Sequence, residues 1–290
     1  MDIVSYLLGK NAGGGGGGGK ISEYFVTEIT ENQTKQAYAW DLIKKLPVIT
    51  VADNVTQISY LFNKDYYKVN GVGMQSNLPK VVCGNNVTNM ANIYNAGGGR
   101  DGYVTQIDVT GLDTTNVTTI AGMFYNRGAL TSIDLSTLDF SKVENCNSMF
   151  FECRALTLID LSMLTGENLG KGQVNVNLSN MFYNCQNATR INLSNLNPSK
   201  ILTLNSFCNS CYSLEELDID KLDLGTYGGD AVTSIFKNCG SNLTGGQMTK
   251  IYVKDVASQT WILGLSTNDR PADWTTDNII IAGSEADLRS

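Results

Sequence analysis

The sequence contains no histidine, and this absence restricts its chemistry more than any other feature. Serine–histidine–aspartate and cysteine–histidine catalysis, histidine-ligated metals and a histidine pH switch are all excluded. An enzyme built from this chain would have to use carboxylates, lysine, tyrosine or cysteine. The sequence also has no run of about 18 apolar residues, so we expect no segment that inserts into a membrane.

Charge and proline are scarce as well. Charged residues make up 17% of the 290 residues, against about 25% in typical domains. The formal net charge is −7, which argues against nucleic acid or an anionic membrane as the main partner, because both need a basic face. There are only 4 prolines but 29 glycines, and 42% of residues are hydrophobic. This composition is typical of a globular protein with a sizeable core.

The 7 cysteines do not form the even set of a disulfide framework. Cys208 and Cys211 spell C-x-x-C, but a zinc site needs a second such pair, and the sequence has none. We interpret the cysteines as small buried core residues, with redox or metal use as the alternative. The sequence predicts no cofactor and no metal site.

The N-terminal region is organised differently from the rest. Residues 1–12 form a short apolar head, and residues 13–19 are consecutive glycines, a flexible linker with a span of about 15 Å. The head lacks the basic region of a cleaved secretory signal. It is either a disordered tail or an anchor peptide that docks into a larger assembly. Residues 20–45 are predicted to form a helical cap that ends before Pro47.

From residue 46 onward the chain repeats a template, L-x-x-L-x-L-x-x-L. The clearest copies begin at Leu130, Leu156, Ala188 and Leu214. Weaker copies flank them on both sides, and the central apolar positions recur every 26 residues, or every 32 or 34 where the chain has an insertion. Each copy predicts a short strand, and a stack of such units buries a continuous core.

A second motif lies between these copies and reads V-x-x-[I/M/C]-x-x-[L/I/M]-[F/Y]. Val117 to Phe124 and Val143 to Phe150 are examples. Its apolar spacing of three, three and one favours a short helical turn rather than a strand. The fold class is therefore an α/β repeat: a solenoid of about eight units with parallel strands in one continuous sheet, short helical turns and a cap at each end.

The segment 116–136 and the M-F-Y-N-C at 181–185 resemble BspA-like leucine-rich repeats. The resemblance covers residues 46–255, and it implies a leucine-rich-repeat solenoid that acts in adhesion. Such repeats occur in bacterial surface proteins, in mycoplasma-type surface lipoproteins and in some phage structural proteins. The last template position is leucine where that family's general pattern has asparagine, so an asparagine ladder is not expected. The N-terminal head and glycines also resemble the start of some gut-phage structural proteins.

A polar column alternates with the core positions of each predicted strand. Because neighbouring strand residues point to opposite faces, these side chains should form an acidic strip on the outside of the stack. The strip consists of Asp108, Asp134, Asp160, Asn192 and Asp218, with Ser136, Ser162 and Ser194 two residues further on. It is either a face that binds a cationic or hydroxyl-rich ligand or a solvated part of the repeat consensus.

Other candidate sites are weaker. Carboxylates cluster at Glu215, Glu216, Asp218 and Asp220, but a glycosidase pair is disfavoured because alternate residues splay to opposite faces. An aromatic stripe (Tyr125, Phe151 and Tyr183) is either a binding surface or a second wall of the core. Glycine-rich insertions at 63–77, 95–103, 165–177, 225–230 and 240–247 are predicted loops. Their expected contact residues are Tyr66, Tyr67, Arg100, Tyr103 and Tyr227.

Residues 256–290 break the period, and we expect a C-terminal cap with a short helix near residues 261–265 and a final strand at Ile279 to Ile281. The predicted function is non-enzymatic recognition of a cell-surface polysaccharide or protein. The chain is expected on a virion surface as a tail, baseplate or head-fibre protein held by its anchor peptide. The alternatives are an extracellular bacterial adhesin and a purely structural virion component.

Overall fold

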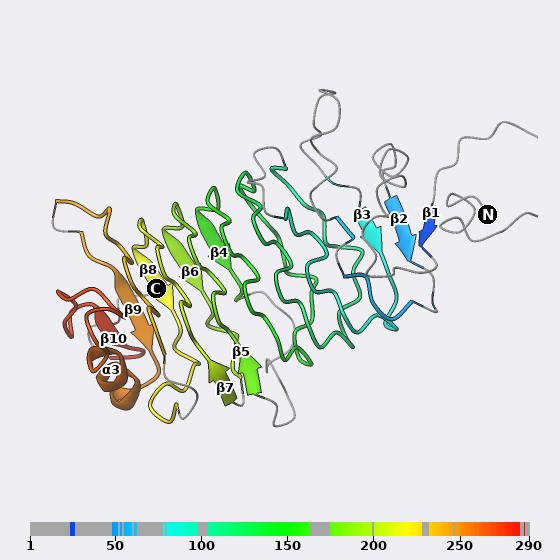
Figure 1. The fold of residues 1–290 in the computed structure, drawn as a ribbon. Coiled ribbons are helices and arrows are strands. Elements are labelled where there is room, and N and C mark those ends of the chain that lie inside the picture. Colours follow the sequence, from blue (N-terminus) through cyan, green and yellow to red (C-terminus); the bar gives the residue numbers. More distant parts are fainter. Residues whose placement is uncertain are drawn as a thin grey trace, which may run out of the picture.

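The structure, a computed structural model, describes most of the repeat region and the C-terminal segment (Figure 1). The described residues are 24–26, 48–51, 53, 55–59, 61–62, 78, 80–97, 104–162, 175–198, 200–227, 232–245, 247–284 and 287. The predicted anchor peptide, the glycine linker, and Tyr66, Tyr67, Arg100 and Tyr103 lie outside them. Within this part of the chain, no helix has the length and apolar character needed to cross a bilayer.

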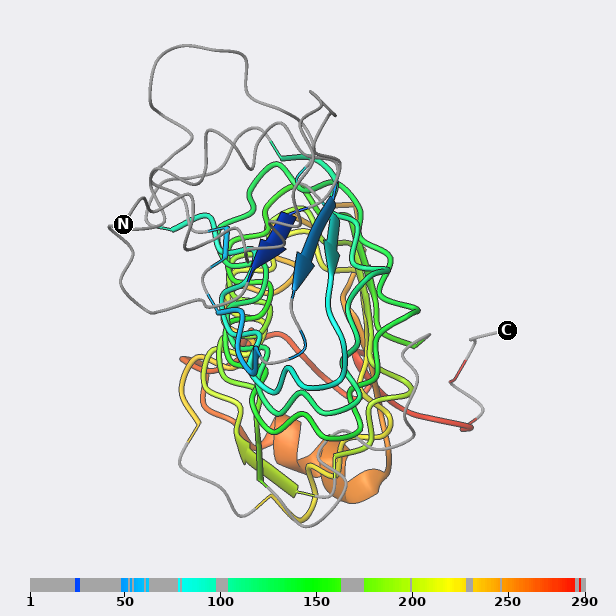
Figure 2. The same ribbon diagram turned by 90° about the vertical axis from the view of Figure 1, so that its right-hand side faces the viewer.

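The chain winds into a solenoid whose strands all pair in parallel. One sheet has the order β1-β2-β3, with β1 at Tyr24–Val26, β2 at Val48–Val51 and β3 at Lys80–Val82. A second has the order β10-β9-β8-β6-β4, with β4 at Leu158–Asp160, β6 at Arg190–Asn192, β8 at Glu216–Asp218, β9 at Lys250–Val253 and β10 at Ile279–Ile281. A third pairs β5 (Asn175–Asn177) with β7 (Lys200–Thr203). Figure 2 shows the successive coils overlying one another.

The five strands from β4 to β10 in the second sheet stack in register because each contributes one aliphatic side chain to the same buried column. Ile159 pairs with Ile191, and the pairing continues through the strands that follow, at Leu217, Ile251 and Ile279. All five side chains are fully buried, whereas Leu158 and Asp160 on either side of Ile159 are exposed. This alternation is the predicted one, and the prediction of a parallel repeat solenoid is confirmed.

The prediction of one continuous sheet is wrong. Residues 104–109 and 131–135 belong to the repeat and are fully described, yet neither segment forms a strand. The sheet that ends at β3 is therefore separated from the sheet that begins at β4 by two coils. One other expectation fails locally, because β5 lies at the end of the predicted loop 165–177. β1 lies within the predicted cap 20–45, whose expected helix falls outside the described residues.

The segments predicted as helical turns are instead chains of tight turns. Along the segment from Ile120 to Arg127, alternate N–H groups bond within the coil and to the next coil. The Met123 N–H donates to the Ile120 carbonyl at 3.0 Å, whereas the Phe124 N–H donates to the Met149 carbonyl of the next coil at 2.9 Å. An α-helix would direct all these donors to its own carbonyls. The three-three-one spacing therefore corresponds to a series of turns that hydrogen-bonds to the next coil.

The inter-coil bonds of this turn segment run in one sense. In each coil, four N–H groups donate to carbonyls of the following coil. They belong to residues 120, 122, 124 and 126 in one coil and to residues 146, 148, 150 and 152 in the next. The series ends at the C-terminal cap. There the Phe236 N–H donates to the Asp269 carbonyl at 2.7 Å, and the Ser234 N–H donates to Asp269 Oδ1 at 2.6 Å.

Two positions of each turn segment adopt left-handed backbone. The first has φ of 62° at Gly122 and 55° at Asn180, and the second has φ of 61° at Asn126 and 60° at Asn184. Glycine and asparagine tolerate this conformation best, and they hold both positions in these two coils, whereas Ser148 and Glu152 hold them in the coil between. At Gly122 a Cβ would lie 2.3 Å from Asn92 Oδ1, so that side chain would have to shift.

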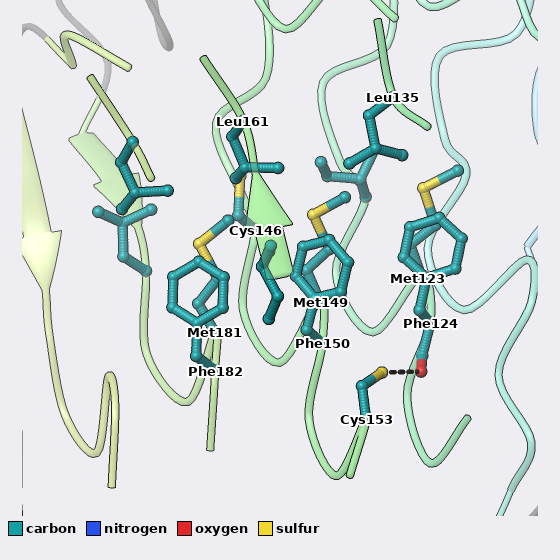
Figure 3. Packing of buried hydrophobic residues seen from close by; sticks show 14 of the residues in the cluster. Met123, Phe124, Leu135, Cys146, Met149, Phe150, Cys153, Leu161, Met181 and Phe182 are labelled. Atoms are coloured by element: carbon teal, nitrogen blue, oxygen red, sulfur yellow. Dashed lines mark hydrogen bonds between the residues drawn. The ribbon is translucent and has the colours of Figure 1, made fainter. Parts of the chain in front are cut away.

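Aromatic rings form a continuous ladder through the core (Figure 3). Phe62, Tyr94, Phe124, Phe150 and Phe182 stack with centroids 5.3 to 5.8 Å apart and nearly parallel planes. The next ring, Phe207, meets Phe182 edge-on at 77°. The cause lies in the sequence: Met-Phe at residues 149–150 and 181–182 becomes Phe-Cys at 207–208, so that Cys208 takes the ring's position in the stack.

A second ladder is made by thiols. Cys153 Sγ donates to the Phe124 carbonyl at 3.1 Å, and the same contact recurs in the next two coils from Cys185 to Phe150 and from Cys211 to Phe182. One coil earlier, the fully buried Arg127 takes this position. Its Nε donates to the Tyr94 carbonyl at 2.5 Å, and its Nη2 donates to the Phe62 carbonyl, two coils away, at 3.1 Å.

The C-terminal segment closes the last coil. Helix α3 (Val256–Leu263), with Asp255 as its N-cap, begins five residues before the predicted position, and β10 is the predicted final strand. Gln259 Nε2 of α3 donates to the Ile279 carbonyl at 2.6 Å. This bond satisfies a group of the last strand of the sheet, where an open edge would invite pairing with another chain.

Candidate functional site

The side chains of the predicted acidic strip accept hydrogen bonds from the backbone of their own turns. Oδ1 of Asp108, Asp134, Asp160 and Asn192 accepts the N–H of the residue two positions on at 2.9 to 3.0 Å, and Asp218 does the same at 3.2 Å. Aspartate and asparagine favour this local turn. The donors include the N–H groups of Ser136, Ser162 and Ser194. The recurrence of these residues therefore has a structural cause that needs no ligand.

The strip is also not equally open along its length. Asp108, Asp134 and Asp160 are exposed and Asn192 is half-buried, whereas Asp218 is only 4% exposed. The serines of the strip are half-buried. Accessible carboxylates therefore gather in the coils before β6, and the strip does not present one uniform face.

A groove lies among the coils that carry these accessible carboxylates. It is on the outer face, where the sheet between β3 and β4 is interrupted. Its volume is about 520 Å³, within the range of about 300–1,000 Å³ that is usual for ligand pockets. Three successive coils line it, with Leu78, Lys80, Gln106, Ile107, Asp108, Ser132, Ile133 and Asp134. The groove thus brings together two residues of the predicted strip, Asp108 and Asp134.

One end of the groove is a polar cluster held in place by short contacts. Lys80 Nζ donates to Thr110 Oγ1 at 2.7 Å and lies 3.8 Å from Asp108 Oδ2. Thr110 donates both its hydroxyl (2.7 Å) and its N–H (2.9 Å) to Asp108 Oδ1. The hydrogen bond from the Thr110 hydroxyl, helped by the nearby Lys80, holds the pKa of Asp108 below its usual value.

Gly111 makes this cluster possible. A Cβ at this position would lie 2.3 Å from the Val81 carbonyl oxygen and 3.0 Å from Lys80 Cε. The missing side chain lets the turn after Asp108 approach β3, where the Gly111 carbonyl accepts the Cys83 N–H at 3.1 Å. The Lys80 side chain lies against this turn and is thereby directed towards Thr110.

Asp134 forms the other charged part of the groove. Its Oδ1 accepts the Ser136 N–H, and this bond lowers the pKa of the Asp134 carboxyl. Both groove carboxylates are therefore ionised at neutral pH, with one ammonium beside Asp108. The apolar part consists of Leu78, Ile107 and the half-buried Ile133.

Sequence reasoning missed Lys80, Gln106 and Ser132. These residues precede the central aliphatic residue of each template copy, as the aspartates follow it, so the same alternation directs them outward. The position before the central aliphatic residue recurs in every copy, but its residue type does not. It is Lys80, Gln106, Ser132, Leu158 and Arg190 in successive copies, so the sequence shows no regular polar column there.

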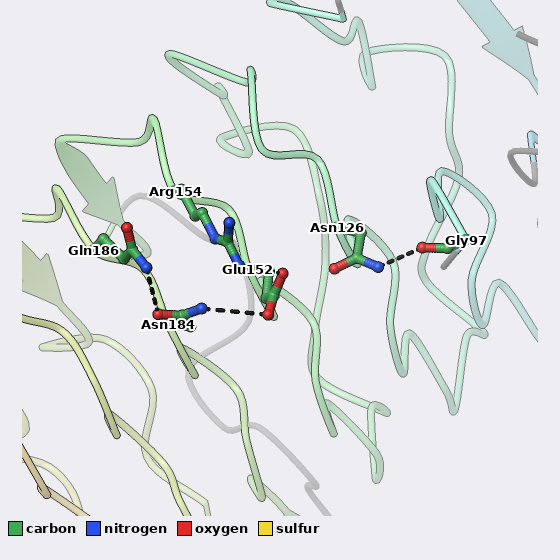
Figure 4. Close-up of polar contacts among 6 residues, drawn as sticks. All are labelled: Gly97, Asn126, Glu152, Arg154, Asn184 and Gln186. Carbon is green, nitrogen blue, oxygen red and sulfur yellow. Dashed lines mark hydrogen bonds and ion pairs between the residues drawn. The ribbon is translucent and has the colours of Figure 1, made fainter. Parts of the chain in front are cut away.

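The aromatic stripe is a second half-buried ladder. Tyr125 and Phe151 stack at 4.5 Å, and Phe151 and Tyr183 at 4.7 Å, with planes within 6°. Because the rings cover one another's faces, only their edges remain for a partner. Polar contacts follow the same coils (Figure 4): Asn184 Nδ2 donates to Glu152 Oε1 at 3.3 Å, and Arg154 pairs with Glu152 at 2.7 Å. This arrangement favours the core alternative.

The remaining candidates are engaged in local contacts. Glu216 lies 2.9 Å from Arg190 Nε, and Asp220 lies 3.3 Å from Lys221 Nζ. Tyr227 packs edge-on against Trp261 at 5.4 Å, and its hydroxyl lies 3.4 Å from the Leu202 carbonyl. It is therefore part of the packing near the cap rather than a projecting loop residue.

All seven cysteines are buried free thiols. Burial raises the pKa of Cys83 to about 11 and raises the pKa of Cys146 and Cys153 further. At these three positions a high pKa leaves little of the reactive thiolate. Among the residues that the structure describes, no group of three or more cysteine, aspartate or glutamate side chains has an arrangement that could hold a metal ion.

One family model matches the chain. It is described as "Mycoplasma protein of unknown function, DUF285", and it matches residues 83–163 and 172–258, together more than half of the chain. The first matched segment contains the groove residues from Gln106 to Asp134, whereas Lys80 precedes it. No curated protein and no solved structure matches the chain.

Proposed function

This chain belongs to the DUF285 family of mycoplasma proteins of unknown function, and on that premise we propose that it is a non-enzymatic recognition module that binds cell surfaces. The observation that carries the proposal is the groove across three coils on the outer face. It is open to solvent, its polar groups are held in place, and it lies where the strand pairing is interrupted.

The finer fold assignment is part of the same proposal. We assign the repeat to the BspA-like leucine-rich type with about eight units, supported by the eight copies of the template in the sequence. Buried thiols that donate to carbonyls of the preceding coil recur at the same repeat position in three successive coils and support the repeat assignment.

The site of action that we propose is a virion surface, with the chain as a tail, baseplate or head-fibre protein and residues 1–12 as its anchor. The support is the resemblance of the N-terminal head and glycines to gut-phage structural proteins. A bacterial cell-surface adhesin is the second candidate, favoured by the match to a mycoplasma family. Both candidates use the repeats in the same way, as a rigid support for a binding face.

Co-sedimentation with intact gut bacterial cells tests the proposal. The full chain and a variant lacking residues 1–20 are mixed with cells and with purified cell-wall polysaccharide. We expect both versions to sediment with cells, because recognition is proposed to lie in the repeats. If neither version binds any strain in a broad panel, the recognition proposal is wrong and a purely structural role replaces it.

A further inference from the structure

The charges at one end of the groove already have partners within the protein. The Lys80 ammonium donates to Thr110 and lies near Asp108, and the Asp108 carboxylate accepts two hydrogen bonds from Thr110. A ligand therefore need not supply an opposite charge to enter this part of the groove. A neutral polar ligand fits it better than a strongly cationic one, which would compete with Lys80 for Asp108.

The other end supplies hydrogen-bond acceptors and donors in a row. Asp134 uses Oδ1 for its turn with Ser136, so Oδ2 points away from that bond. The exposed amide of Gln106 and hydroxyl of Ser132 occupy the neighbouring outward column. A carboxylate accepts from two hydroxyls at once, and bonds to an ionised acceptor are stronger than those between neutral groups.

Apolar surface lies beside these polar groups. Leu78 and Ile133 line the groove, and Leu158, one coil after Ser132 in the same outward column, is 51% exposed. A sugar ring presents adjacent hydroxyls on its rim and apolar C–H groups on its faces. The mixture of an ionised acceptor, an amide, a hydroxyl and aliphatic side chains matches that chemistry.

We propose that this groove binds a saccharide, with Asp134 accepting from ring hydroxyls, Lys80, Gln106 and Ser132 completing the polar contacts, and Ile133 packing against the ring. The inference rests on the proposed recognition function and names its ligand class. It also concentrates binding in three coils, in place of the full strip from Asp108 to Asp218.

The repeat itself provides a matched pair of variants. Asn192 occupies the same position as Asp134 and makes the same turn, with Oδ1 accepting the Ser194 N–H at 3.0 Å. Asp134→Asn should therefore keep the turn and the fold while it removes the ionised acceptor. Asp160→Asn makes the same change one coil further on, at an exposed position that does not line the groove.

The test measures binding of the full chain and both variants to the bacterial cells that retain it and to polysaccharide purified from them. The cells are used untreated, after periodate oxidation of their glycans, and after protease digestion. We expect Asp134→Asn to weaken binding at least tenfold and Asp160→Asn to leave it within twofold. Periodate should abolish binding, and protease should not.

Two results would overturn the inference while leaving recognition intact. If Asp134→Asn binds as well as the unmodified chain, the groove is not the site. If protease abolishes binding and periodate does not, the ligand is a protein. Absence of binding by the unmodified chain to every strain would instead overturn the proposed function together with the inference.

Discussion

The coils before β4 and the coils from β4 onward are built from the same template, but they present different outer surfaces. From β4 to β10 the strands pair in register, and the polar groups of the later coils are partly covered, as at Asp218 and Glu216. Between β3 and β4 the strand pairing lapses and a groove opens. Regular repetition gives stability, and the departure from it provides the candidate binding surface.

The two regions also differ in how their coils are held together inside. In the later coils the thiols of Cys185 and Cys211 each donate to one carbonyl of the preceding coil. The earlier region has one such thiol, Cys153, and in addition Arg127, which reaches the carbonyls of two preceding coils. The region with the interrupted sheet thus has the longer internal connection. Stability measurements on variants of both regions show whether this difference matters.

The largest expected effect is in the regular region. Leu161→Asp would place a charge at a fully buried position of the later coils and should destabilise the fold by more than about 4 kcal/mol. Leu158→Asp, in the same coil but pointing outward, should change stability by no more than about 0.5 kcal/mol. Urea denaturation of both variants checks this, and equal effects would disprove the alternation that defines the outer face.

The next effect concerns the earlier region. Arg127→Met retains much of the side-chain volume but removes the donors to the Tyr94 and Phe62 carbonyls. Leaving buried carbonyls without donors should cost about 2–4 kcal/mol. Cys185→Ala, which removes one weaker donor in the later coils, is the comparison. A larger loss for Cys185→Ala would show that Arg127 is not the main connection of the earlier coils.

A smaller effect is expected at the groove's support. Gly111→Ala would bring a Cβ within 2.3 Å of the Val81 carbonyl oxygen, and relieving this overlap should cost about 1–3 kcal/mol. It should also displace Lys80 and weaken binding to cells. Gly84→Ala is the control, since its Cβ would meet nothing closer than 3.8 Å. If the two variants have the same melting temperature, the turn at Gly111 is not closely packed.

The smallest expected effect is a loss of stability at low pH. Local hydrogen bonds lower the pKa of Asp108 and Asp134, so the folded chain binds protons less readily at these sites than the unfolded chain. Their contribution to stability is present above the ordinary carboxyl pKa of about 3.9 and is lost as the pH falls below it.

Melting temperatures of the unmodified chain and of Asp108→Asn, measured from pH 7 to pH 3, test this dependence. The difference in melting temperature between the two proteins should be constant above about pH 5 and should become smaller below about pH 4. A difference that widens in acid would contradict the assignment of Thr110 and Lys80 as partners of the ionised form.

The sequence predicted the buried columns well because they depend on a local rule, the alternation of side chains along a strand. Ile159, Ile191 and Leu217 are aligned in the fold as they are in the template. It mispredicted the helical turns because the apolar spacing from Ile120 to Phe124 does not reveal where the backbone donors point. Their direction depends on the neighbouring coil, which a single unit does not contain.

The groove could be predicted only in part for a similar reason. The alternation rule placed Asp108 and Asp134 on the outside, but it did not indicate that pairing lapses between residues 104 and 135. The contacts that shape the groove, such as the close approach of Gly111 to β3, join coils 30 residues apart, and a single repeat unit does not contain them. The local turn made by each aspartate was also absent from the prediction, although the spacing of Asp134 and Ser136 is typical of it.

The one-way hydrogen bonds of the turn segments give the stack of these segments a net dipole along the solenoid axis. Peptide dipoles alternate in direction along a β-strand and largely cancel, but here four per coil point the same way, as all of them do in an α-helix. The partial positive end faces the C-terminal cap. Asp269 meets it there with both its backbone carbonyl and its carboxylate. The two ends of this stack of turns therefore differ in sign, and the excess is three N–H groups per coil, because one N–H of each coil, such as that of Thr118 to the Thr88 carbonyl, points the opposite way.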